Sequence, residues 1–358
     1  MNDVSAPSVK GLIDSTINVL EVRELSVHFA GRGRWRHRRE VKAVDGVSFD
    51  IAQGEILALV GESGCGKSTI ALSVMRLLVP TSGRIISGGE DLATLRGRAL
   101  RRARRRIQMI FQDPFGSLNQ RQSVYDTVVE PLIIHQLGAT SQERRSMVMD
   151  ALDLAHLRPP ERLAEAYPHE LSGGQRQRVA IASAMVMRPE LVIADEPVSM
   201  LDVSARAGIL RLMMDLRDRL GTSYLFITHD LAVAWMVADR IAVVYLGRIV
   251  EIGPATQIVD EPAHPYTRAL LSVSSGEDIG ADGAVTDVLP GETPSAANVP
   301  PGCRFHPRCP LFVQLGEPAI CRSEDPALRI VLARRSSAYD RPPGVHQSAC
   351  HFANEESS

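Results

Sequence analysis

The stretch Gly61–Thr69, GESGCGKST, constrains the fold more than any other part of the chain. It fits the pattern G-x-x-x-x-G-K-[ST], in which successive backbone N–H groups of a glycine-containing loop face one phosphate anion. The apolar run 56–60 precedes it and the amphipathic segment Ile70–Leu78 follows it, an order that predicts strand, phosphate loop and helix. We therefore predict a nucleotide-phosphate site made of Gly61, Glu62, Ser63, Gly64, Cys65, Gly66, Lys67, Ser68 and Thr69.

Two side chains of this loop have specific tasks. The ammonium group of Lys67 is placed to reach the β- and γ-phosphates, and the hydroxyl of Ser68 is a typical Mg²⁺ ligand. The helix that begins here adds the positive end of its dipole to the same anion site. A glycine-rich turn without a ligand is the alternative, but strand, loop and GKST together favour the phosphate site.

Composition and length exclude several other classes of protein. Of the 358 residues, 44% are hydrophobic and 23% charged, as in ordinary globular proteins, and the formal net charge of −2 gives no reason to expect nucleic-acid binding. No apolar run approaches the roughly 20 residues of a membrane span, and residues 1–16 lack the pattern of a secretory signal. We therefore expect a cytosolic protein whose five cysteines are thiols or metal ligands.

Alternating and branched apolar runs predict the strands. Asn18–Ala30 alternates apolar and polar residues and predicts an edge strand, and Val41–Ile51 predicts a second strand. The runs Leu191–Ala194, Tyr224–Thr228 and Ile241–Leu246 are short and separated by helical segments, which is typical of parallel strands in an α/β sheet. Without an internal repeat, the chain is expected to carry one nucleotide module.

Two basic runs and a helical region lie between these strands. Gly31–Arg39 is either a solvated hairpin tip or a contact for lipid head groups or a partner, whereas Arg96–Arg106 has helical spacing and predicts a solvated helix face. Ile107–Gln112 predicts a short buried strand. From Ser117 to about residue 162 the pattern is helical, with breaks expected at Pro131 and at residue 138.

Two further motifs belong with the phosphate loop. The apolar strand 191–196, LVIADE, ends in two carboxylates, of which Asp195 is placed beside Mg²⁺ and Glu196 is placed to accept a proton from an attacking water. The sequence LSGGQ opens a helix and makes a second anion-binding turn, which suggests a site completed in trans. The residues of this turn are Leu171, Ser172, Gly173, Gly174 and Gln175.

With these motifs in order, the chain resembles the ATP-binding subunits of ABC transporters over about 19–271. The resemblance implies a Walker A loop at 61–68, a signature at 171–175 and a Walker B strand at 191–195. It further implies that Gln112 is the Q-loop glutamine, which senses Mg²⁺ and water, and that Glu196 is the catalytic base. Asp202 would be the D-loop aspartate, and His229 would hold the γ-phosphate. Two subunits would enclose two ATP molecules, each between one phosphate loop and the opposite signature.

The same resemblance implies the fold and its division. We expect an α/β fold: a P-loop ABC-type nucleotide-binding domain (a RecA-like core plus a helical subdomain) with a small cysteine-rich C-terminal extension. The expected boundaries are 1–271 for the nucleotide-binding domain, about 115–185 for its helical subdomain, 272–301 for a linker and 302–358 for the extension. An aromatic residue of the first strand should stack on adenine, with Phe29 the first choice and Trp35 the second; Arg23 or the hairpin backbone could contribute.

Four of the five cysteines lie near the C-terminus, namely Cys303, Cys309, Cys321 and Cys350. They could hold a zinc ion or a [4Fe–4S] cluster, with His306, His346 or His351 as substitute ligands, or they could be unliganded thiols. The spacing does not decide among these, because no C-x-x-C pair is present. Together with HPYT at 264–267, the segment resembles the C-terminal extension of oligopeptide/dipeptide importers, in which an iron–sulfur cluster can occur.

The resemblance implies an ATPase that energises peptide import from the cytoplasmic face of the cell (inner) membrane. Its partners would be a second ABC ATPase subunit, two membrane permease subunits and an extracytoplasmic substrate-binding protein, with no nucleic acid. Oligosaccharide or nickel uptake is an alternative, because the D-loop Ser-Met-Leu-Asp departs from the commoner Ser-Ala-Leu-Asp. A soluble ABC ATPase acting on nucleic acid or ribosomes is a distant alternative.

Overall fold

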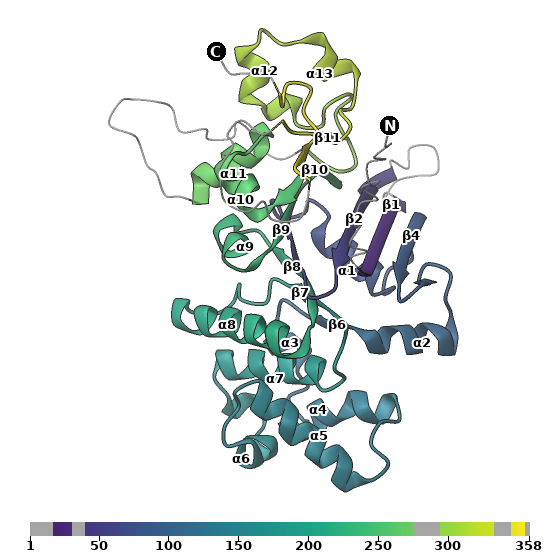
Figure 1. Cartoon of the computed structure of the whole chain (residues 1–358), viewed down its shortest axis with the longest axis vertical. Coiled ribbons are helices and arrows are strands. Elements are labelled where there is room, and N and C mark those ends of the chain that lie inside the picture. Colours follow the sequence, from purple (N-terminus) through teal and green to yellow (C-terminus); the bar gives the residue numbers. More distant parts are fainter. Residues whose placement is uncertain (1–16, 31–39, 275–293, 333–344, 355–358) are drawn as a thin grey trace, which may run out of the picture.

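The computed structural model describes residues 17–30, 40–274, 294–332 and 345–354, so the basic insert at 31–39 and Trp35 lie outside the described residues. The molecule is elongated, with the sheets in its upper and middle parts and a group of helices below (Figure 1). The first sheet has the order β2-β1-β4-β5. Its strands are β1 (Asn18–Ala30), β2 (Glu40–Ala52), β4 (Ser82–Ser87) and β5 (Glu90–Asp91).

The prediction of an edge position for β1 is wrong. Val22 of β1 pairs with Phe49 of β2 on one side and with Ile85 of β4 on the other, so β1 is an inner strand. Its alternation still has the expected physical meaning, because one face of β1 packs on the protein core while the other carries polar residues. The sequence did not indicate β4, whose run SGRIIS is too short and polar to stand out.

The second sheet holds the phosphate loop at the end of one of its central strands. Its order is β11-β12-β10-β9-β3-β8-β7-β6, and the strands from β9 to β6 are parallel, as predicted. The strands are β11 (Arg329–Ile330), β12 (Gln347–Ser348), β10 (Arg248–Pro254), β9 (Arg240–Tyr245), β3 (Ile56–Val60), β8 (Ser223–Thr228), β7 (Leu191–Asp195) and β6 (Ile107–Ile110). Since parallel strands end at one edge, the residues that follow β3, β6, β7 and β8 are brought together.

Strand β3 is buried on both faces and separates two apolar cores. Leu57 and Leu59 face the core shared with the first sheet and with α1 (Lys67–Val74). Ala58 and Val60 face the core shared with the helices below. This alternation follows from the two-residue period of a strand, and it explains why all five residues of β3 are apolar.

The remaining helices lie beside the sheets, in the lower part of the molecule and, for the last two, at its top (Figure 1). Their bounds are α2 (Gly97–Arg106), α3 (Pro114–Ser117), α4 (Val124–Ile134), α5 (Ser141–Leu154), α6 (Pro160–Glu165), α7 (Gly173–Met185), α8 (Val203–Leu220), α9 (Leu231–Val237), α10 (Ala255–Asp260), α11 (Pro265–Ser274), α12 (Pro310–Gln314) and α13 (Ala319–Ser323). Among the described residues, no helix is both long and apolar enough to cross a bilayer.

The predicted helix break at Pro131 is wrong, whereas the one at Gly138 is confirmed. Pro131 lies inside α4 and cannot donate to the carbonyl of Thr127, one turn earlier. That carbonyl instead accepts a hydrogen bond from the Ser183 hydroxyl of α7 at 3.3 Å, so the loss is offset by a neighbouring helix. Gly138 has φ +73° in the connection to α5, a conformation that favours glycine.

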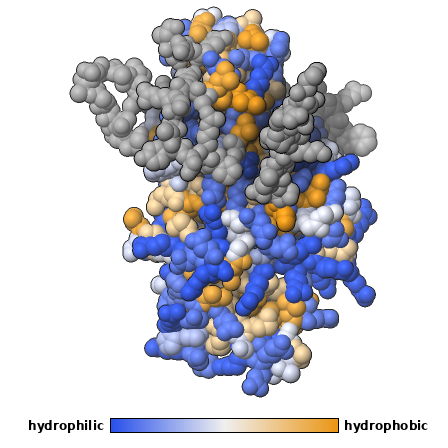
Figure 2. All heavy atoms as spheres, in the orientation of Figure 1, coloured by the Kyte–Doolittle hydropathy of each residue, from blue (hydrophilic) through white to orange (hydrophobic). Residues whose placement is uncertain are grey.

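The basic run predicted to form a helix is α2, and Ala103 is its one buried residue. Two of its arginines nevertheless stabilise neighbouring backbone, and one of them, Arg106, donates to the carbonyl of Ser87 at 3.0 Å. Arg104 donates to the carbonyls of Met75 and Arg76, at 2.9 and 2.8 Å, which lie just beyond the end of α1. The rest of the run is a largely solvated face, in keeping with the hydrophilic surface over much of the lower half of the molecule in Figure 2.

The C-terminal residues pack on the nucleotide-binding domain and complete its second sheet. Ser348 of β12 pairs with Glu251 of β10, and β11 pairs with β12. Phe305 belongs to the same apolar core as Tyr245 of β9 and Tyr266 of α11. We name residues 302–332 and 345–354 the C-terminal extension; it forms the top of the molecule in Figure 1. Of the expected linker, 275–293 lies outside the described residues.

Candidate active site

The phosphate loop is held against backbone from two other strands. A Cβ atom on Gly61 would lie 2.2 Å from the carbonyl oxygen of Val244, and one on Gly66 would lie 2.4 Å from that of Ala43. Gly66 also has φ +112° as the residue before α1. These two positions therefore require glycine, and the loop is fixed by the ends of β9 and β2.

The residues of the loop predicted to bind phosphate and Mg²⁺, Lys67 and Ser68, both form hydrogen bonds within the protein. Lys67 is 5% exposed, and its ammonium group donates to the carbonyls of Gly61 (2.6 Å) and Glu62 (3.0 Å). The Ser68 hydroxyl donates to Asp195 Oδ1 at 3.3 Å. Burial raises the pKa of Asp195, and the bond from Ser68 opposes that shift. A hydroxyl and a carboxylate so placed are suitable ligands for Mg²⁺.

Cys65, in the middle of the loop, is 2% exposed, and burial raises the pKa of its thiol. Reactive cysteines are exposed and have lowered pKa values. Cys65 is therefore a small packing residue rather than a nucleophile.

Three of the predicted catalytic residues form one hydrogen-bonded group. Gln112 Nε2 donates to Glu196 Oε2 at 2.9 Å, and His229 Nδ1 lies 3.1 Å from Glu196 Oε1. These residues follow the neighbouring strands β6, β7 and β8, so adjacent parallel strands bring them to one edge. Glu196 has φ +46°, an uncommon conformation for a residue with a side chain, and such strain is often found at functional sites.

This group can position a water molecule and take a proton from it. A carboxylate acts as a general base when it lies within hydrogen-bonding reach of the water that it deprotonates. Both oxygens of Glu196 are engaged by flanking side chains, which fixes the plane of the carboxylate. The His229 side chain is 58% exposed, so the group faces solvent on one side.

The signature residues have a clear local role. Ser172 is the N-cap of α7 and forms a capping box with Gln175, while Leu171 is buried in the core beneath. Ser172 is exposed, so the N-terminus of α7 is accessible from outside the subunit.

Asp202 is likewise the N-cap of α8 and accepts a hydrogen bond from Ala205 N–H at 2.9 Å. The start of α8 lies beside the signature, because a Cβ on Gly174 would be 3.4 Å from that of Ala205.

The candidate adenine-stacking residue lies near the phosphate loop. Phe29 is 41% exposed at the end of β1 and pairs with Val41 of β2, two residues before Ala43, whose carbonyl contacts Gly66. Arg23 forms an exposed ion pair with Glu21 at 3.0 Å. Phe29 is thus an exposed aromatic residue on the strand that pairs with β2.

Two residues beside the phosphate loop were missed by the sequence analysis. The Tyr266 hydroxyl accepts a hydrogen bond from Glu62 N–H at 2.9 Å, and Arg308 forms an ion pair with the Glu62 carboxylate at 3.0 Å. Tyr266 belongs to the HPYT sequence, which was noted only as a feature of the extension. Arg308 is 246 residues from Glu62, so no local pattern could have indicated the contact.

The four C-terminal cysteines all line one small pocket, whose wall includes the aromatic rings of Phe305 and Phe312. Burial raises the pKa of Cys303 to about 12, and those of Cys309 and Cys350 to about 11. Among the described residues, no group of three Cys, His, Asp or Glu side chains is placed so that it could hold a single metal ion. Thiols gathered in an apolar pocket are nevertheless the donor type that zinc and iron–sulfur clusters use.

The three histidines considered as substitute ligands are engaged elsewhere through at least one ring nitrogen. His306 Nδ1 lies 2.8 Å from the carbonyl of Cys303, and His351 Nε2 lies 3.0 Å from that of Glu324. His346 Nε2 lies 2.7 Å from the buried carboxylate of Glu251. His306 and His351 line the same pocket as the four cysteines, each with one ring nitrogen bound to a backbone carbonyl.

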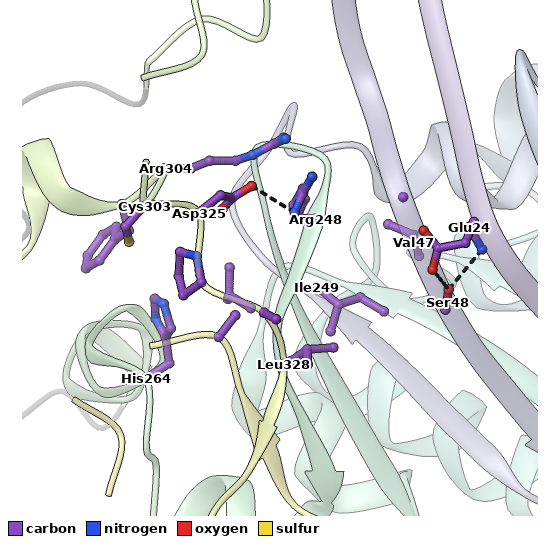
Figure 3. A pocket seen from close by; sticks show the side chains of 16 residues that line it. Glu24, Val47, Ser48, Arg248, Ile249, His264, Cys303, Arg304, Asp325 and Leu328 are labelled. Atoms are coloured by element: carbon purple, nitrogen blue, oxygen red, sulfur yellow. Dashed lines mark hydrogen bonds and ion pairs between the residues drawn. The ribbon is translucent and has the colours of Figure 1, made fainter. Parts of the chain in front are cut away.

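A second cavity of about 270 Å³ lies between the first sheet and the C-terminal extension (Figure 3). Its charged groups are paired within the protein. Arg248 Nη1 lies 2.8 Å from Asp325 Oδ2, and Arg304 bonds to Asp45 and to the carbonyl of Leu246. The cavity therefore lies where the first sheet and β10 meet the C-terminal extension, and charged side chains around it form ion pairs with each other.

The sheet order, the phosphate loop and the carboxylate group at the strand ends define an ATP-binding cassette ATPase. Residues 44–199 match the family described as "ABC transporter", and residues 250–314 match "Oligopeptide/dipeptide transporter, C-terminal region". The chain is similar to the di/tripeptide transport ATP-binding protein DppF of Pseudomonas aeruginosa, with 42% identity over 94% of this chain and 98% of that protein. It is also similar to the oligopeptide transport ATP-binding protein AppF of Bacillus subtilis, with 45% identity over 87% and 93%.

Solved structures agree with this assignment. CbiO1 of Clostridium perfringens, described as part of the ABC transporter complex cbiONQ, has a TM-score of 0.59 and 30% identity, over 68% of this chain and 91% of that one. The dimeric cassette MJ0796 bound to ADP and phosphate has a TM-score of 0.57 and 31% identity, over 64% and 96%. The chain therefore belongs to the ATP-binding subunits of ABC transporters, and it carries the C-terminal region of the oligopeptide/dipeptide branch.

Proposed function

We propose that the protein hydrolyses ATP to drive the import of peptides through a membrane complex. The hydrogen-bonded group of Gln112, Glu196 and His229 beside the phosphate loop is the observation that supports hydrolysis. The C-terminal region at 250–314 and the names of the relatives support peptide import. The same role in oligosaccharide or nickel uptake remains the alternative.

In the proposed reaction, Glu196 accepts a proton from a water molecule whose oxygen attacks the γ-phosphorus. The bond between that phosphorus and the β–γ bridging oxygen breaks, which yields ADP and phosphate. Lys67 offsets negative charge on the transferred group, and His229 and Gln112 orient the water. Ser68 and Asp195 would hold Mg²⁺, which would neutralise part of the negative charge of the phosphates.

The exposed Ser172 and the half-buried Gly174 fit a second role, in which they contact the γ-phosphate held by a partner subunit. That partner is a second ABC ATPase, either identical or homologous. Asp202, at the start of the adjacent helix, would couple the two sites. Phe29 would stack on adenine.

Docking to two permease subunits is supported by exposed apolar residues just after β6 and at the end of α4. Phe111, which precedes Gln112, is 45% exposed, and Ile133 and Ile134 at the end of α4 are 58% and 51% exposed. Exposed apolar side chains that gather on a surface often mark protein contacts. We propose that these contacts hold the subunit at the cytoplasmic face of the cell (inner) membrane, with an extracytoplasmic binding protein on the other side.

For the cysteine pocket we propose a [4Fe–4S] cluster, with Zn²⁺ as the alternative. A cluster is bulkier than one ion, so its four thiolates stand farther apart, which agrees with four cysteines around one pocket but no three placed for a single ion. Protein purified without oxygen should contain about four irons and four sulfides per chain. Cys303→Ser should lose them, whereas Cys65→Ser, in the phosphate loop, should not; one zinc or no metal would refute the cluster.

The catalytic assignment is tested with Glu196→Gln, which keeps the shape of the side chain but removes the base. We expect phosphate release to fall by about 10²- to 10⁴-fold, while ATP still binds and holds a dimer together. Glu190→Gln is the matched control, because Glu190 is an exposed carboxylate next to the opposite end of β7. Undiminished phosphate release by Glu196→Gln would refute the assignment.

Transport is tested in cells that express the complete complex. Uptake of a labelled dipeptide that fails with Glu196→Gln and persists with Glu190→Gln would support peptide import. Uptake of an oligosaccharide or of nickel instead would favour the alternative, and co-purification with RNA or ribosomes rather than permeases would contradict both.

A further inference from the structure

Glu62, the second residue of the phosphate loop, is held by side chains from outside the ATP motifs. The Arg308 guanidinium binds its carboxylate through two bonds, Nη1 to Oε2 at 3.0 Å and Nη2 to Oε1 at 3.2 Å. The backbone N–H of Glu62 donates to the Tyr266 hydroxyl at 2.9 Å. Arg308 is 6% and Tyr266 0% exposed, so both contacts lie in the interior.

The same residue also holds the lysine of the loop. The carbonyl of Glu62 accepts a hydrogen bond from the Lys67 ammonium at 3.0 Å. Glu62 is therefore fixed through its side chain, its N–H and its carbonyl, and this fixes the backbone from which Lys67 must reach the phosphates. A two-bond contact between arginine and a carboxylate sets orientation as well as distance, which a single contact does not.

Arg308 also offsets the negative charge that Glu62 places in the phosphate loop. A carboxylate beside a triphosphate repels it, and the repulsion is strong where solvent is largely excluded. The Glu62 side chain is 25% exposed, and the Arg308 guanidinium supplies an opposite charge next to it. Removing that charge would leave a negative group in the loop that binds an anion.

Arg308 belongs to the C-terminal extension, and the packing of the extension determines its position. It ends the one-turn helix His306–Arg308, which lies between Cys303 and Cys309, two residues of the cysteine pocket. Phe305, just before this turn, packs edge-on against Tyr245 with ring centroids 5.3 Å apart. The position of Arg308 thus depends on the packing of the extension against the sheet.

We propose that Arg308 is a positioning residue for ATP binding, through which the C-terminal extension fixes Glu62 and the geometry of the phosphate loop. The inference rests on the assignment of residues 61–69 as the phosphate site. It predicts that the extension sets the affinity for ATP and contributes little to the chemical step, because Arg308 binds Glu62 of the loop whereas Glu196 is bound by Gln112 and His229.

The first test compares Arg308→Gln and Arg308→Lys with the unchanged protein in ATP titrations and in steady-state hydrolysis by the complete transporter. For Arg308→Gln we expect the Kd and KM for ATP to rise about tenfold, within the usual range of coupling between neighbouring groups, and kcat to stay within about twofold. Arg308→Lys keeps the charge without the two-bond geometry and should recover part of the affinity. Arg322→Gln, an exposed arginine paired with Glu317 in the same extension, is the matched control and should change neither constant.

A double-mutant cycle identifies the partner through which Arg308 acts. If the effect passes through Glu62, the combined Glu62→Gln and Arg308→Gln variant should lose much less affinity than the sum of the two single losses. Tyr266→Phe removes only the acceptor for the Glu62 N–H and should also raise the Kd, which keeps the proposal testable if Arg308→Gln fails to fold. An unchanged Kd in folded Arg308→Gln or Tyr266→Phe, or additive losses in the cycle, would overturn the proposal.

The proposal can fail without the phosphate-loop assignment, and the two failures are distinguishable. Lys67→Ala should abolish tight ATP binding. If it does so while Arg308→Gln binds ATP normally, only the positioning role is refuted. If Lys67→Ala binds ATP with normal affinity, the loop assignment itself is wrong.

Discussion

Truncation of Phe305 should destabilise the nucleotide-binding domain, although the residue lies in the C-terminal extension. Phe305 is 1% exposed and contacts three rings of the domain, with centroid distances of 5.3 Å to Tyr245, 5.4 Å to Tyr266 and 5.7 Å to His264. It also lines both the cysteine pocket and the cavity of about 270 Å³, as do Cys303 and His264. Phe305→Ala would leave a gap beside these spaces and remove all three ring contacts.

The expected cost follows from this environment. Replacing a buried phenylalanine by alanine costs about 3–5 kcal/mol, and the cost is largest where the site cannot collapse around the gap. The surrounding rings are themselves held by strand β9 and helix α11, which limits collapse. We therefore expect the free energy of unfolding to fall by about 4 kcal/mol, and the melting temperature by about 10 °C.

Calorimetry and urea unfolding measure this change. Val313→Ala is the control, because Val313 is 68% exposed on α12 of the same extension and its truncation should cost less than about 0.5 kcal/mol. Phe305→Leu should fall between the two. If Phe305→Ala melted at the temperature of the control, the extension would not share the core of the domain and the reasoning would be refuted.

Three further predictions use single contacts. Burial lowers the pKa of His264 to about 4, so the folded protein favours the neutral form of this side chain. The free energy of unfolding should therefore be highest above about pH 6.5 and fall by about 3 kcal/mol as the pH drops toward 4. In His264→Gln this loss should be smaller. Ser183→Ala should lower the unfolding free energy by about 1 kcal/mol in urea titrations, because the Thr127 carbonyl loses the donor that replaces Pro131. Gly66→Ala should abolish ATP binding in titrations, because its Cβ would meet the Ala43 carbonyl.

Local sequence patterns predicted most strands of the second sheet and the ATP motifs. Apolar runs such as β3 and β7 are buried on both faces, so their composition alone separates them from helices and surface strands. Motif spacing then placed Asp195 and Glu196 at a strand end, and the structure brings Glu196 to Gln112 and His229. The order of strands in a sheet has no such local signal, which is why the inner position of β1 was missed.

Contacts between distant segments account for what the sequence did not indicate. Pro131 remains helical only because Ser183 of another helix binds the freed carbonyl, and no pattern near Pro131 reports that. Arg308 reaches Glu62 through the packing of the extension, which the sequence presented as an appendix after a linker. The four cysteines were recognised as a set, but their spacing did not show that they share one pocket.

The pairing of β12 with β10 has a consequence for synthesis on the ribosome. Glu251 of β10 is 0% exposed, and its carboxylate is bound by the N–H groups of Ala263 and His264 and by His346, which follows 95 residues later. At usual rates of translation that interval lasts roughly 5 to 20 seconds. During this interval, the Glu251 carboxylate lacks its bond to His346, and the edge of the second sheet at β10 lacks β12 and β11. Chaperones and proteases could therefore distinguish an unfinished chain from a finished one.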